Sequence, residues 1–162
     1  MQKITLEQSS SVKLSIALHE SKNDLNLGVV QISHGMAEHM GRYSHFINHL
    51  NEEGFHVIIH NHRGHGDRLV DNKIGFFASS GGWQLIVDDL VSVHNWALNQ
   101  YPESHHILMG HSMGSWAALS ALQGKTKFDL ALISGSSKPK TLETFFQKLL
   151  VKFETIRLGP SG

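Results

Sequence analysis

The chain has 162 residues, of which 40% are hydrophobic and 17% charged, a composition typical of one soluble globular domain. Its 14 basic and 14 acidic residues balance, so no net field attracts phosphate-rich partners, and binding to nucleic acid is disfavoured. The sequence has no cysteine, which excludes disulfides and cysteine metal sites. It shows no apolar run of signal-peptide or membrane-spanning length, so a cytoplasmic location is expected.

The first third of the chain predicts three strands and one helix. Residues 2–8 and 12–18 alternate weakly and form a leading pair of strands, joined by the serine turn Ser9–Ser11. Residues 27–33, LGVVQIS, form a short apolar run that suits a strand buried on both faces. A helix that ends at Gly54 follows. Its apolar face is spaced i, i+3, i+4, i+7 and comprises Tyr43, Phe46, Ile47 and Leu50.

The next segments continue the alternation. Residues 55–60, FHVIIH, predict a buried strand, followed by a glycine-rich loop from Arg63 to about Gly82. A second amphipathic helix stops before Pro102. Its apolar face comprises Ile86, Leu90, Val93 and Ala97.

The pattern then repeats once more. The run HILMG predicts a strand, residues 113–123 a helix, and residues 130–134, LALIS, a further strand. Strands that alternate with helices of ten or more residues indicate the α/β class, with a mostly parallel sheet and helices on both faces.

The carboxyl end carries a wide apolar stripe within residues 142–156. The simplest interpretation is a helix packed on a core. The sharper hypotheses are a lid over a lipid-binding cleft and a helix that makes transient contact with a membrane surface. The stripe comprises Leu142, Phe145, Phe146, Leu149, Leu150, Phe153 and Ile156.

The segment ILMGHSMGSWAALSAL joins a predicted strand to a predicted helix through Ser112. A strand that turns directly into a helix pushes the residue at the apex toward positive φ, and side chains two residues before and after it would collide. Gly110 and Gly114 occupy those two places, so the spacing predicts a sharp turn that presents the Ser112 hydroxyl at a helix amino terminus.

That geometry suits acyl transfer. The serine hydroxyl attacks a carbonyl carbon, and the N–H of Met113 points at the developing oxyanion. A second donor is needed, and the N–H of Met36, directly after the His34–Gly35 pair that ends the strand at residues 27–33, is a fitting source. The alternative to this catalytic interpretation is a purely structural glycine-flanked turn.

Three stretches together resemble the α/β-hydrolase superfamily, in particular its branch of monoacylglycerol lipases and lysophospholipases, also described as serine aminopeptidase-like. They are SHGMAEHMGRYSHFINHL, NHRGHGD and MGHSMGS, and the likeness runs from about residue 27 to the end. The resemblance implies Ser112 as the nucleophile, with the N–H groups of Met36 and Met113 as the oxyanion hole. It implies a lipid ester as the small-molecule substrate and no cofactor. His34, Gly35 and His111 are expected to bind the substrate.

Two departures from the family pattern touch the loop that contains NHRGHGD. An acidic residue usually stands two residues before the arginine, where this chain has Asn61. A serine usually follows the second glycine by two residues, where this chain has Arg68. Both are expected to affect how the loop is braced and not the reaction.

The third departure concerns the catalytic triad, whose acid and histidine follow the serine in this fold. No histidine follows His111, and after Ser112 the one aspartate is Asp129, expected at the opposite end of the sheet. The turn should aim His111 away from the serine hydroxyl, and His34, although close, has a structural role in the family. Without a base, the rate falls by roughly 10²–10⁴-fold.

The simplest explanation is that the chain is the amino-terminal part of such a hydrolase. Residues 1–136 would then be part of the core, residues 137–162 would begin the helical cap, and a carboxyl-terminal segment would complement the site. The strand at 130–134 would be left as an apolar edge. The rival hypothesis is a binding protein that keeps the fold without catalysis.

A metal site is the remaining alternative. His60, His62 and His65 have the spacing H-x-H-x-x-H, which can bind zinc. The segment coincides with the loop of the hydrolase resemblance, however, and no metal is expected. His105 and His106 are expected to face solvent.

Overall fold

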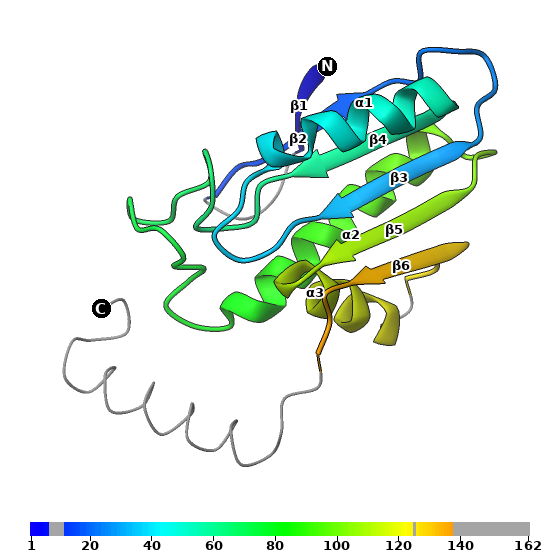
Figure 1. The fold of residues 1–162 in the computed structure, drawn as a ribbon. Helices are drawn as coiled ribbons and strands as arrows, with labels where there is room; N and C mark the ends of the chain where they lie inside the picture. Colours follow the sequence, from blue (N-terminus) through cyan, green and yellow to red (C-terminus); the bar gives the residue numbers. More distant parts are fainter. Residues whose placement is uncertain (7–11, 125, 138–162) are drawn as a thin grey trace.

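The computed structural model describes residues 1–6, 12–124 and 126–137, which form six strands and three α-helices with one short 3₁₀ helix (Figure 1). The predicted order of strands and helices is confirmed. The serine turn at 9–11 and the apolar stripe at 142–156 lie outside the described residues. The elements are β1 (Gln2–Leu6), β2 (Leu14–His19), β3 (Gly28–Ser33), η1 (Met40–Tyr43), α1 (Ser44–Glu53), β4 (Phe55–His60), α2 (Gly82–Gln100), β5 (His106–His111), α3 (Met113–Gln123) and β6 (Leu130–Ser134).

The strands form one sheet in the order β1-β2-β4-β3-β5-β6. β1 pairs antiparallel with β2, and β2 pairs antiparallel with β4. β4, β3, β5 and β6 are all parallel. The carboxyl ends of these four strands therefore meet at one edge of the sheet, where the loops that follow β3, β4 and β5 lie close together.

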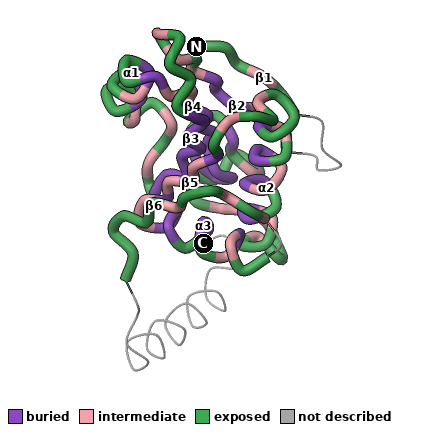
Figure 2. Tube along the Cα trace, turned by 90° about the vertical axis from the view of Figure 1, so that its right-hand side faces the viewer, coloured by how far each residue is buried: buried purple, intermediate pink, exposed green. Residues whose placement is uncertain are grey.

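Helices cover both faces of the sheet, as predicted (Figure 1). On one face, Ile47 of α1 packs with apolar side chains of β2, β3 and β4. On the other face, the buried side chains of α2 and α3 pack against β2, β3, β4 and β5. Buried residues concentrate along the central strands (Figure 2). The helix α1 ends at Gly54, which adopts the predicted left-handed conformation with a φ of 104°.

The strand β6 forms one edge of the described sheet and remains largely exposed. Leu130, Leu132 and Ile133 are among its exposed side chains, which confirms the predicted apolar edge. None of the helices that the structure describes is long and apolar enough to cross a membrane.

Candidate active site

Ser112 lies in the turn between β5 and α3, with a φ of 50° and a ψ of −120°. The positive φ predicted from the glycine spacing is confirmed. A Cβ at position 110 would lie 2.6 Å from the carbonyl oxygen of Gly114. A Cβ at position 114 would collide with the carbonyl oxygen of Ser33 in β3. The two glycines thus allow the turn to form and α3 to lie directly against β3.

We expect Gly114→Ala to lower the free energy of unfolding by roughly 1–3 kcal/mol, because backbone atoms on both sides must move apart. Urea denaturation followed by circular dichroism measures this change. The matched control is Gly124→Ala at the other end of α3, where φ is −76° and the new methyl group would lie 3.2 Å from one carbonyl oxygen. The control should change stability by less than about 1 kcal/mol. Equal effects of the two variants would contradict this account of the turn.

The loop after β3 lies directly beside Ser112. A Cβ on Gly35 would be 3.2 Å from the Cβ of Ser112. The N–H of Gly35 donates to Glu38 Oε2 at 2.9 Å, so it is not available to a ligand. The next N–H, that of Met36, makes no hydrogen bond with any described residue. Met113 is the first residue of α3, where backbone N–H groups have no partner within the helix.

Glu38 braces this loop from within. Besides the N–H of Gly35, its Oε2 accepts the Tyr43 hydroxyl at 2.9 Å, and Arg42 lies 3.5 Å from Oε1. Burial alone would raise the pKa of Glu38, but these hydrogen bonds and the charge of Arg42 together lower it. Roles for Glu38, Arg42 and Tyr43 were not predicted from the sequence. The signal was the motif E-H-x-x-R-Y, in which all three residues occur.

A second loop, residues 61–68 after β4, forms hydrogen bonds with the loop after β3 and is called the clamp loop below. The N–H of Ala37 donates to His65 Nε2 at 3.2 Å, and the N–H of Met40 donates to Asn61 Oδ1 at 2.8 Å. The N–H of His62 donates to His34 Nε2 at 3.0 Å. These hydrogen bonds fix the loop that carries Met36 at three separate points.

His34 is fully buried, which corrects the prediction that its side chain binds substrate. Because its Nε2 accepts the N–H of His62, its Nδ1 carries the proton and donates to the carbonyl oxygen of Gly35 at 2.8 Å. Burial lowers its pKa to about 4. The lone pair on Nε2 is therefore engaged by the N–H of His62, so His34 supports the loop and is not available as a base. Gly35 is also buried, and its role is to let the loop approach Ser112.

His111 and Asp129 do not complete a triad with Ser112. The Nδ1 of His111 lies 3.3 Å from the Ser134 hydroxyl in β6, so the ring is held toward β6. Asp129 accepts the N–H of His106 at 2.7 Å, at the amino end of β5 and thus at the end of the sheet opposite Ser112, as expected.

His106 itself is buried, which corrects the prediction that it faces solvent, because α2 and the turn before β5 cover it.

Of the three histidines in the rival metal hypothesis, His62 and His65 form hydrogen bonds, whereas neither ring nitrogen of His60 has a hydrogen-bond partner among the described residues. The ring centroids of His60 and His62 are 5.0 Å apart, but His62 Nε2 lies 3.0 Å from the Ser33 hydroxyl. The Nδ1 of His65 donates to the carbonyl oxygen of Arg63, and its Nε2 accepts the N–H of Ala37. No three histidine, aspartate or glutamate side chains converge as metal ligands in the part of the chain that the structure describes.

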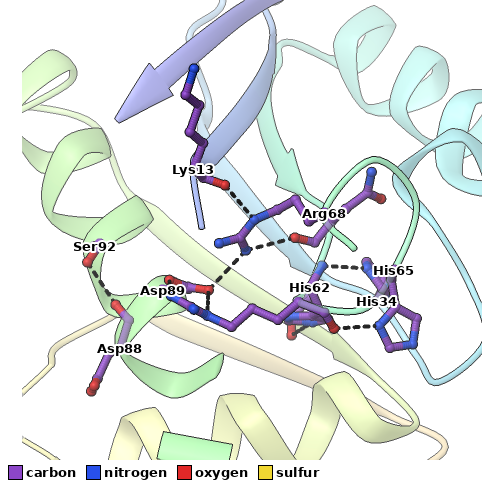
Figure 3. A network of polar contacts seen from close by, with 11 residues as sticks. Lys13, His34, His62, His65, Arg68, Asp88, Asp89 and Ser92 are labelled. Carbon is purple, nitrogen blue, oxygen red and sulfur yellow. Dashed lines mark hydrogen bonds and ion pairs between the residues drawn. The ribbon is translucent and has the colours of Figure 1, made fainter. Parts of the chain in front are cut away.

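The clamp loop is itself anchored to α2 by a buried ionic network (Figure 3). The Asp89 carboxylate accepts hydrogen bonds from Arg63 Nε at 2.9 Å and from Arg63 Nη2 at 3.1 Å. Arg68 Nη1 lies 2.9 Å from the same carboxylate. Arg68 also donates to the carbonyl oxygens of Lys13 and Asn61. Arg68, which stands where the family pattern has a serine, thus links the residue before β2, the clamp loop and α2.

A cavity of about 230 Å³ lies between the loop after β3 and the carboxyl end of β5. Its lining includes the loop-bracing residues Glu38 and Tyr43 and the His111 ring. His111 lines this cavity, and its contact with substrate stays a prediction. A larger cavity, of about 390 Å³, lies at β2 and β4, and β3 separates these strands from β5.

Residues 26–156 match a family model described as serine aminopeptidase, S33. A monoglyceride lipase of Rattus norvegicus is 32% identical over 129 residues, which cover 75% of this chain and 41% of that protein. A monoacylglycerol lipase of Mycolicibacterium smegmatis is 35% identical over 94 residues, which cover 54% of this chain and 29% of that protein.

Solved structures show the same architecture. A thermostable carboxyl esterase from Bacillus coagulans superposes with a TM-score of 0.82 at 25% identity, covering 98% of this chain and 51% of that one. A soluble variant of the monoglyceride lipase from Saccharomyces cerevisiae gives a TM-score of 0.70 at 20% identity, covering 97% and 52%; at this identity the likeness shows the fold alone. The chain spans about half the length of these structures and less than half the length of the two lipases.

Proposed function

Because the chain belongs to the serine aminopeptidase S33 family and has the α/β-hydrolase fold, we propose that it supplies the nucleophile and the oxyanion hole of a hydrolase that cleaves carboxylic esters of lipids. The observation that carries this proposal is the turn at Ser112, with its positive φ, beside the braced loop at Gly35. The monoglyceride lipase and the monoacylglycerol lipase among the relatives support a monoacylglycerol as the substrate class, and a lysophospholipid is the alternative that the sequence resemblance implies.

In the proposed reaction, Ser112 Oγ attacks the ester carbonyl carbon and its proton passes to a base. The carbonyl oxygen becomes an oxyanion that the N–H groups of Met36 and Met113 receive. Collapse of this intermediate breaks the bond to the alcohol, which leaves with the proton from the base. Water then attacks the acyl-enzyme by the same route, and the fatty acid is released.

The base and the acid are the parts of this mechanism that the described residues do not provide. His34 has its lone pair occupied, His111 is held toward Ser134, and Asp129 lies at the far end of the sheet. We therefore propose that turnover requires a histidine and an acid from a complementing segment. Residues 1–136 would form the core to which that segment docks, and residues 137–162, of which 138–162 lie outside the described residues, would begin a cap.

We expect the 162-residue chain to show little or no esterase activity and only slow labelling by a fluorophosphonate probe, because no base activates the serine. Mass spectrometry of the labelled chain should find the adduct on Ser112, and Ser112→Ala should abolish it. Ser134→Ala, which removes a neighbouring hydroxyl group, is the matched control and should retain the slow labelling.

Rapid turnover of a short-chain ester that Ser112→Ala abolishes would contradict the need for a complementing base. Labelling at another serine would contradict the assignment of the nucleophile.

The occupied lone pair of His34 also favours a second candidate function, a binding protein without catalysis. That function would hold if no complementing segment with a histidine and an acid restores activity.

A further inference from the structure

The cavity of about 390 Å³ lies on the α1 side of the sheet, and β3 separates its strands from the one that leads to Ser112. Its volume is within the range of small-molecule pockets, roughly 300–1,000 Å³. β2 and β4 form its base, and η1, the start of α1 and the loop after β4 form its walls. The apolar part of its lining comprises Met1, Ala17, Met40, Ile47 and Ile59.

The rim of this cavity offers hydrogen-bond donors. His39 Nδ1 accepts the N–H of Gly41 at 3.2 Å, so the proton of this ring resides on Nε2, which is left to donate. The exposed Ser44 at the start of α1 supplies a hydroxyl group on the same rim.

The one carboxylate in the lining is already engaged. Asp67 Oδ1 accepts Asn61 Nδ2 at 2.8 Å, and Asp67 Oδ2 pairs with Lys3 Nζ at 2.6 Å. A cationic ligand would therefore find no free carboxylate here. A ligand with an acceptor head group would find donors at His39 and Ser44, and His19 and Met1, whose N-terminal ammonium lies near His19, line the same cavity.

We propose that this cavity binds a fatty acid, with its alkyl chain on the apolar base and its carboxylate at His39 Nε2 and the Ser44 hydroxyl. The apolar base disfavours a sugar or another ligand that is polar throughout, because its hydroxyl groups would lose their bonds to water there. The inference concerns a binding site away from Ser112 and does not depend on the proposed hydrolysis.

The five methionines of the chain allow a direct test. Met1 and Met40 line the cavity, Met109 lines the smaller one, and Met36 and Met113 flank Ser112. We expect sodium decanoate, added below its micelle concentration to the 162-residue chain labelled with ¹³C in the methionine methyl groups, to shift the Met1 and Met40 resonances saturably. The Met36 and Met113 resonances should not move.

Two matched comparisons test the recognition of the carboxylate. Decanol, which has the same chain length without a charge, should bind at least tenfold more weakly than decanoate. His39→Asn keeps an acceptor that can cap η1 but withdraws the imidazole donor, and it should weaken decanoate binding about tenfold. His45→Asn, on the exposed side of α1, should leave the affinity unchanged.

Ala17→Leu, which fills the base of the cavity, should abolish the shift of Met40 while the other methyl resonances show that the chain is folded. Shifts confined to Met36 and Met113 would place the ligand at Ser112 and overturn the proposal. Equal affinities for decanoate and decanol, or no shift at all, would also overturn it.

Discussion

Replacing Asp89 by alanine is expected to lower the free energy of unfolding by about 3–5 kcal/mol, because it leaves two buried guanidinium groups without their carboxylate. Asp89, Arg63 and Arg68 are each at most 3% exposed. Burial alone would raise the pKa of Asp89, yet the two arginines lower it, so the carboxylate is charged at neutral pH. Urea denaturation at pH 7.5 measures the loss.

The neighbouring Asp88 provides the matched control. It is exposed, and its carboxylate accepts a hydrogen bond from Gln84 one turn earlier in α2, at 2.8 Å. Asp88→Ala should change the free energy of unfolding by about 0.5 kcal/mol or less. Arg68→Ser, which restores the residue of the family pattern, should cost less than Asp89→Ala, because Arg63 still binds the carboxylate through two nitrogens. Equal free energies of unfolding for the Asp89→Ala and Asp88→Ala variants would contradict the role of the ionic network in anchoring the clamp loop.

Acidification from pH 6.5 to 4 is the second change with a large expected effect, a loss of several kcal/mol of stability. Burial lowers the pKa of His34 to about 4 and that of His60 to about 3, and it lowers the pKa of His62 well below its usual value of 6.5. Below pH 6.5 the unfolded chain binds protons at these histidines that the folded chain does not bind. Stability is therefore full above pH 6.5 and falls as the pH decreases toward the folded-state pKa values.

The magnitude follows from one pKa unit being worth about 1.36 kcal/mol, so His34 alone accounts for roughly 3 kcal/mol between pH 6.5 and 4. Urea titrations at several pH values measure the slope. His60→Leu should make the dependence of stability on pH less steep, because it removes one buried histidine with a lowered pKa. The substitution breaks no side-chain hydrogen bond, since neither ring nitrogen of His60 has a partner among the described residues. Replacing His45 and His49, which are exposed on α1, should leave the slope as it is. A stability that does not depend on pH between 6.5 and 4 would contradict the burial of the histidines as the cause.

The sequence by itself determined the elements and the turn at Ser112, because both depend on local physics. The alternation of apolar runs and amphipathic faces located the six strands and three α-helices that the structure describes. The positive φ of Ser112 was predicted from the spacing of Gly110 and Gly114 around it. The clash that Gly110 relieves is local, with Gly114 and Ser115, whereas the clash that Gly114 relieves is with Ser33 of β3 and depends on the tertiary structure. The position of Asp129 at the far end of the sheet followed from the direction of a parallel strand.

Only the tertiary structure decided the roles of the histidines and arginines. His34 is a loop support because β4 lies next to β3, which brings the N–H of His62 to its ring. Arg68 and Arg63 share Asp89, although this aspartate lies more than 20 residues away in the chain. His106 was expected in solvent, but it is buried against α2. Hydrogen bonds and ion pairs between distant segments depend on strand order and on the packing of the helices, and residue spacing contains no record of either.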